Sequence, residues 1–182
     1  MSLLELMFYN ITSQTKTLFT HSLLSLEKIN KQTFNIMYEI FQLIHKALFF
    51  VVMLLGLAVL AKAAMGLSGK TAFGETDKKL GLFFMISNHT QLLIGLVLYL
   101  FLSPFGLDAI NGLGMSAVMK NPEYRQIAVE HVTTNIIAII LITIGYSKNK
   151  RAFNDVAKHK NALIFYGLGL VLLLSRIPWS KL

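Results

Sequence analysis

The stretch IAVEHVTTNIIAIILITIG, residues 127–145, is long and apolar enough to cross a lipid bilayer. About 20 helical residues, each rising ~1.5 Å, match a hydrocarbon core ~30 Å thick. An imidazole or carboxamide facing hydrocarbon costs several kcal/mol, so polar members of such a helix must face other helices. One face of this helix, at steps of three and four residues, carries mostly polar and small side chains. Its members are His131, Thr134, Asn135, Ala138, Ile142 and Gly145.

Composition extends this interpretation to the whole chain. Of its 182 residues, 54% are hydrophobic and 14% charged, with a mean hydropathy of +0.59, whereas soluble domains carry about 25% charged residues. The apolar residues form separate blocks, which predicts an all-α polytopic membrane protein: one up-down four-helix transmembrane bundle. The expected spans cover about residues 45–64, 80–102, 127–145 and 161–177. Thr76 or Asp77 is the expected cap of the second helix, and residues 103–126 should form a long loop in which Asn121-Pro122 starts a helix.

Residues 1–36 form an N-terminal extension to this domain, which covers residues 37–182. Their short apolar runs are interrupted by polar residues, and neither run is long enough to span a membrane. We expect an interfacial amphipathic helix here. The alternative is that translation starts at Met37.

The net charge of +8 sits mostly in short loops between the spans. Orientation in a membrane explains such a distribution without a nucleic-acid partner. The positive-inside rule places the loops at residues 65–79 and 146–160 in the cytoplasm and both termini outside, because these loops hold most of the lysines and arginines. They carry Lys70, Lys78, Lys79, Lys148, Lys150, Arg151, Lys158 and Lys160, against Lys120, Arg125, Arg176 and Lys181 on the other side.

Histidines are the candidate functional residues. His45 and His131 come early in spans one and three, which run parallel in an up-down bundle and can lie diagonally across its core. Two inward imidazoles there could ligate one b-type haem iron axially. His89, near the bilayer midplane, is the next candidate, and His159, near the inner surface, is the last; the sequence leaves their pairing open. His89 borders an inward stripe of its span formed by Gly81, Asn88, Gln91, Gly95 and Tyr99.

Several other chemistries lack support. The chain has no cysteine, which excludes disulfides, iron–sulfur clusters, thiolate-ligated haem and covalent haem attachment. Zinc is disfavoured because Glu130 is the only evident carboxylate ligand. No nucleophile motif supports a Ser/His/Asp triad.

Four glycines in the spans should leave room for the flat haem macrocycle: Gly56, Gly81, Gly95 and Gly145.

Two other functions compete with the haem hypothesis. Histidines at membrane boundaries are ordinary, and buried ones can tie helices together by hydrogen bonds worth roughly 0.6 kcal/mol each. The chain would then be a haem-free structural or partner subunit. A proton or solute path through Glu130, His131 and His89 is the third class, because ionisable groups inside membranes mark such paths.

Four motifs resemble a family of small four-helix membrane proteins, widespread in Bacteroidota-type bacteria, that are labelled cytochrome B or cytochrome-b-like. They are ISNHTQLLIGLVLYLFLSPF, MKNPEYRQIAVEH, IAIILITIGYSKNKRA and AKHKNALIFYGLGLVLLLSRIPW. The resemblance covers roughly residues 40–180, and the family's histidines match His45, His89, His131 and His159. Members often have a histidine where this chain has Tyr146, so a haem held at that position is not expected here.

The resemblance implies haem-binding electron transfer in the bacterial inner membrane. We therefore expect an electron-transfer or haem-carrying subunit with haem b, rather than a stand-alone enzyme. Its expected partners are the lipid bilayer, a quinone or a redox partner subunit, and a second copy in a homo-oligomer.

Overall fold

The described part of the chain is built from helices. The computed structural model describes residues 3–179, and within this range it has no strand. Lys181, counted above among the positive charges of the outer side, lies outside this range. Four helical stretches are long and apolar enough to cross a membrane, which confirms the all-α class and the four candidate spans. They are Ser13–Gly69, Glu75–Leu113, Pro122–Arg151 and Asp155–Ser175.

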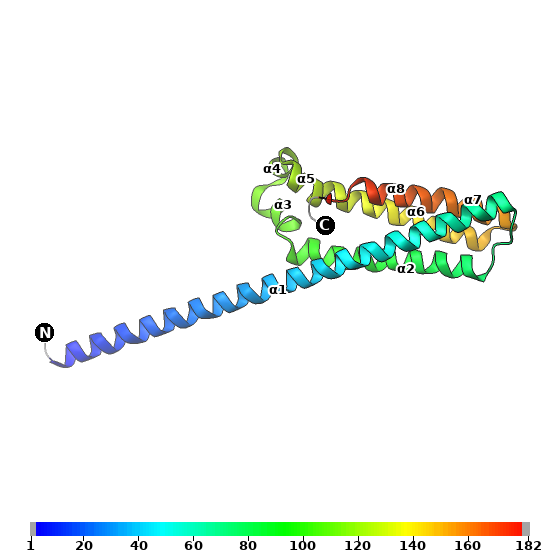
Figure 1. Ribbon diagram of the computed structural model, residues 1–182. Helices are drawn as coiled ribbons and strands as arrows, with labels where there is room; N and C mark the ends of the chain where they lie inside the picture. Colours follow the sequence, from blue (N-terminus) through cyan, green and yellow to red (C-terminus); the bar gives the residue numbers. More distant parts are fainter. Residues whose placement is uncertain (1–2, 180–182) are drawn as a thin grey trace. The chain divides into compact units, whose positions relative to one another are not determined.

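Eight α-helices and three π-helical turns make up the described range. Helix α2 packs beside α6, and α6 packs beside α8 (Figure 1). The elements are α1 (Leu3–Gly69), α2 (Glu75–Val97), a π-helix (Leu98–Leu102), α3 (Leu107–Leu113), α4 (Met115–Lys120), α5 (Pro122–Arg125), a π-helix (Gln126–His131), α6 (Val132–Arg151), α7 (Asp155–Asn161), a π-helix (Ala162–Tyr166) and α8 (Gly167–Ser175).

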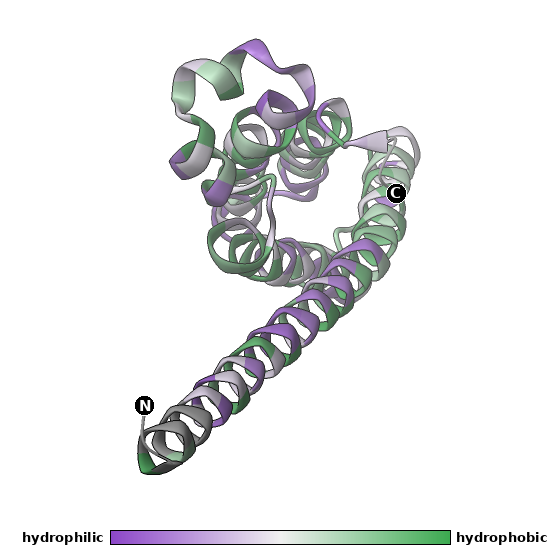
Figure 2. Ribbon diagram, turned by 90° about the vertical axis from the view of Figure 1, so that its left-hand side faces the viewer, coloured by the Kyte–Doolittle hydropathy of each residue, from purple (hydrophilic) through white to green (hydrophobic). Residues whose placement is uncertain are grey.

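The chain divides into two units, Met1–Ile40 and Phe41–Leu182. The domain boundary predicted after residue 36 falls within the first unit and stays a prediction. This unit is helical from Leu3 onward. Hydrophilic and hydrophobic residues alternate along it, whereas the spans of the second unit are predominantly hydrophobic (Figure 2).

The polar and small-residue face predicted for residues 127–145 does face the other helices. Ala138, Ile142 and Gly145 are buried, and His131 and Asn135 are half-buried. The apolar core of the second unit includes Val52, Val59, Ala63, Phe84, Ile142, Ala162, Tyr166 and Leu170. The helical spacing therefore identified the inward face of this span correctly.

Glycines in the spans receive large side chains from neighbouring helices. A Cβ on Gly81 would lie 3.1 Å from the Tyr166 hydroxyl oxygen, and one on Gly145 would lie 2.6 Å from the Cβ of Phe165. Gly56 packs in the same way against Leu170 and Phe84. The expectation that Gly56, Gly81 and Gly145 leave room for a macrocycle is therefore wrong, because protein side chains fill that room.

Two connections differ in part from expectation. Helix α2 begins at Glu75 with Gly74 as its cap residue, not Thr76 or Asp77, because the Gly74 N–H donates to the Asp77 carboxylate at 2.9 Å. Residues 103–126, expected as a long loop, contain the short helices α3, α4 and α5. The predicted helix start at Asn121 is confirmed, since its side-chain oxygen accepts hydrogen bonds from two backbone N–H groups.

Gly145→Ala tests this close helix packing. We expect it to lower the free energy of unfolding by about 1–3 kcal/mol, because the new methyl group meets a Cβ that cannot rotate away. Thermal unfolding of the detergent-solubilised protein, followed by circular dichroism, measures the change. Gly167→Ala is the matched control, because its Cβ would lie 3.7 Å from the nearest atom, Leu60 Cδ2. Equal stability of the two variants contradicts the packing argument.

Candidate functional site

The first expected histidine pair is brought together. The ring centres of His45, on α1, and His131, at the end of the π-helix before α6, lie 6.3 Å apart. Their ring planes meet at 66°, edge to face. Two imidazoles from spans distant in sequence thus face one another in the second unit, and π-helical turns are frequent at functional sites.

Hydrogen bonds hold the His131 ring at both nitrogens. Its Nδ1 lies 2.9 Å from the backbone carbonyl oxygen of Arg176, and its Nε2 lies 3.0 Å from Nδ2 of Asn135. The carbonyl can only accept, so Nδ1 carries the proton and Nε2 accepts from the Asn135 amide. Metal-binding histidines commonly have this tautomer, with the proton given to a carbonyl and the other nitrogen free to ligate.

The His45 ring lies against Gly95 of α2. A Cβ on Gly95 would come 3.0 Å from Cε1 of His45, so only glycine permits this approach without displacement of the ring. The Gln91 side chain donates through Nε2 to the backbone carbonyl of His45 at 3.0 Å. Helix α2 therefore positions both the ring and the backbone of this residue.

Unsatisfied polar atoms gather at the same place. Five shielded side-chain polar atoms in the described residues lack a hydrogen-bond partner. Three belong to this site: Nδ1 of His45, Oε1 of Gln91 and Oδ1 of Asn135. Most buried polar groups in proteins are paired with protein or ordered water, so a group of orphaned atoms marks a place that an ordered water, an ion or a bound group can occupy.

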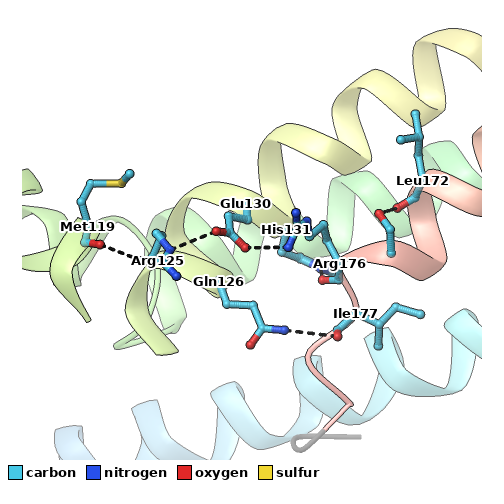
Figure 3. Close-up of polar contacts among 9 residues, drawn as sticks. Met119, Arg125, Gln126, Glu130, His131, Leu172, Arg176 and Ile177 are labelled. Atoms are coloured by element: carbon cyan, nitrogen blue, oxygen red, sulfur yellow. Dashed lines mark hydrogen bonds and ion pairs between the residues drawn. The ribbon is translucent and has the colours of Figure 1, made fainter. Parts of the chain in front are cut away.

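An ion-pair network adjoins the His131 ring. The Glu130 carboxylate accepts from Nε of Arg125 at 3.0 Å and from Nη1 of Arg176 at 3.2 Å (Figure 3). Gln126 Nε2 donates to the Ile177 carbonyl at 3.3 Å. These contacts fix the segment after α8 against the π-helix, and with it the Arg176 carbonyl that orients His131.

The other two candidate histidines are not brought to this pair. His89 is exposed on the surface of the second unit, where its Nδ1 lies 2.8 Å from the Met85 carbonyl oxygen and its Nε2 lies 3.4 Å from Thr143 Oγ1. His159 is 1% exposed and lies 3.2 Å from the Thr71 carbonyl oxygen, with its ring beside Phe73. Each ring contacts a second element, Thr143 of α6 for His89 and the segment before α2 for His159, as the helix-tying hypothesis expects.

A smaller polar group lies near the start of α2. Lys62 Nζ is 3.7 Å from the buried Asp77 carboxylate, and the two residues line a cavity of about 10 Å³ together with Tyr166. That volume is about the size of one water molecule. No group of three or more metal-binding side chains occurs in residues 3–179. A two-histidine site lies below that number, so this finding does not bear on it.

Comparison of this chain with family descriptions, curated proteins and solved structures found no match.

Two residues that contribute to the site, Arg176 and Gln91, were not predicted from sequence. Arg176 acts on His131 through its backbone carbonyl, which no side-chain pattern reveals. Gln91 shared the predicted inward stripe of its span, but its bond to His45 crosses 46 positions of sequence. Neither contact can be read from the spacing within one helix.

Glu130→Ala tests the network beside His131. Both arginines lose their carboxylate, so we expect the free energy of unfolding to fall by about 1–2 kcal/mol, a modest value because both arginines are partly exposed. Thermal unfolding measures it. Asp108→Ala removes an exposed carboxylate from α3 as the control and should change stability by less than about 0.5 kcal/mol. A Glu130→Ala variant as stable as the control contradicts this role.

Proposed function

We propose that the chain is a multi-pass membrane protein that binds b-type haem between His45 and His131 and serves as an electron-transfer or haem-carrying subunit. The observation that carries this proposal is the facing imidazole pair, 6.3 Å apart, surrounded by three orphaned polar atoms. The resemblance of the histidine motifs to cytochrome-b-like proteins agrees with it. A haem-free helix-tying role explains His89 and His159 better than it explains this pair.

The two imidazoles would hold the haem iron, since their ring centres lie 6.3 Å apart and imidazole is a common ligand of haem iron. His45 Nδ1 has no partner, and His131 Nε2 is engaged only by the Asn135 amide, which can turn aside.

The surrounding residues orient and enclose the pair. The Arg176 carbonyl holds the proton on His131 Nδ1, and the Glu130 ion pairs keep that carbonyl in place. Gly95 lets the His45 ring approach α2. Haem, when bound, supplies a one-electron couple whose potential depends on its axial ligands and the dryness of its pocket. As electron donor or acceptor we propose a membrane quinone or a redox partner subunit.

The proposed location is the bacterial inner membrane, with residues 65–79 and 146–160 in the cytoplasm and both termini outside. Positive charge in these two segments supports this orientation. The hydrogen bond between His159 Nε2 and the Thr71 carbonyl supports placing the two segments on the same side of the membrane, since Thr71 belongs to the first segment and His159, in α7, to the second.

A reduced-minus-oxidised difference spectrum of the full chain, purified in detergent, tests the haem proposal. We expect a b-type band in the parent protein and its loss in His45→Ala and in His131→Ala, since each removes one axial ligand. His89→Ala and His159→Ala should keep the band, because both rings lie away from the pair.

A folded parent protein without any haem band contradicts the proposal and favours the haem-free subunit. A band that survives His131→Ala contradicts the ligand assignment while keeping the haem. Circular dichroism of each variant shows whether a lost band reflects loss of the ligand or loss of the fold.

Single cysteines in this cysteine-free chain test the orientation. A membrane-impermeant maleimide added to intact cells should label Lys120→Cys and should label Lys79→Cys and Arg151→Cys only after lysis. All three residues are exposed, so accessibility of the side chain does not limit the reaction. The reverse labelling pattern contradicts the proposed topology.

A further inference from the structure

The N-terminal unit leaves large apolar side chains uncovered. Along its helix, Phe19 is 67% exposed, Leu26 59% and Ile40 50%. Contiguous exposed apolar surface of this kind marks interaction sites in soluble segments. Something must cover this face.

Six of the uncovered apolar side chains follow a heptad repeat, whose two remaining positions are Asn30 and Thr33. Steps of four and three residues connect Phe19, Leu23, Leu26, Asn30, Thr33, Met37 and Ile40, and the same spacing continues at Ile44. Ile29, Ile36 and Leu43 are exposed as well and widen this apolar face along one side. The opposite positions of the heptad are polar: His21, Ser25, Lys28, Gln32, Asn35 and Glu39. A seam with a 3.5-residue period facing a polar back is the pattern of a coiled coil.

The asparagine within the seam favours one partner over others. Asn30 takes an a position, between Leu23 and Met37 in the same row. A single buried asparagine at an a position pairs with its counterpart on the partner helix and sets register and strand number, usually a parallel dimer. A second copy of the same chain supplies that counterpart in matching register.

The connection to the first span favours the same partner. The segment leads into that span without a loop, as part of one helix, α1. Copies in one membrane insert in the same direction, so the same segment of each copy leaves the membrane on the same side and can pair in parallel.

We infer that residues 19–44 form a parallel two-stranded coiled coil with the same segment of a second copy of this chain. The seam consists of Phe19, Leu23, Leu26, Asn30, Thr33, Met37, Ile40 and Ile44. The inference is independent of haem, since it uses no residue of the His45–His131 pair.

Cross-linking of single cysteines in the full-length chain tests the inference, because the parent has no cysteine. Membranes holding Leu26→Cys or Met37→Cys are oxidised with copper phenanthroline and run on non-reducing gels. A parallel dimer brings identical seam positions within disulfide reach. The matched controls are Lys28→Cys and Asn35→Cys, two residues away on the polar face, which should stay monomeric.

Molar mass provides the second measurement. The detergent-solubilised parent should have the mass of two copies, Leu26→Lys that of one copy, and Lys28→Glu that of two. Leu26 and Lys28 are both exposed within the single chain, so neither change disturbs its own packing. Equal cross-linking on both faces, no cross-linking at the seam, or a monomeric parent overturns the inference; the last two outcomes point to a lipid-bound helix instead.

Discussion

Close contact between helices through glycine is the constraint on which the second unit depends. Lipid tails are as apolar as leucine, so burial of apolar surface does not drive helices together in a bilayer and packing must do so. The Tyr166 ring rests on Gly81 of α2 and on Gly145 of α6, and thus joins three segments at once. The same principle acts at the candidate site, where Gly95 receives the His45 ring.

Much of this arrangement could be predicted from sequence because a bilayer penalises polar groups so strongly. The stripe through Asn135 and Ala138 turned inward as the helical spacing required, and so did Asn88, which is 1% exposed. The expectation that His45 and His131 meet used only the depth of each residue in its span and the side of the helix on which it lies. Depth follows from the number of residues from the helix end, and the side follows from the helical repeat. Neither changes much when the predicted helix end is wrong by one or two residues.

The features that could not be predicted from sequence depend on how each helix is rotated about its axis and on which side chains of neighbouring helices fill the space at a glycine. His89 bordered the inward stripe of its span, yet the structure turns it to the outer surface, because neighbouring residues on a helix point about 100° apart. The π-helical turns before α6 and α8 each add a residue to a turn and shift the face that follows. Whether a glycine receives a ring or a cofactor depends on a neighbouring helix whose position no local pattern contains.

Both ends of the second unit pair their charges, and both leave neutral polar atoms without a partner. Near the start of α2, Asp77 is buried and meets both Lys62 and the Gly74 N–H, while Nδ1 of His159, whose ring lies beside Phe73, has no hydrogen-bond partner. At the opposite end Glu130 pairs with two arginines, and three neutral atoms lack partners: His45 Nδ1, Gln91 Oε1 and Asn135 Oδ1. Unpaired atoms alone therefore do not separate the two ends. What separates them is the imidazole pair, whose ring centres lie 6.3 Å apart at one end only, because imidazole is the side chain that most commonly binds metals.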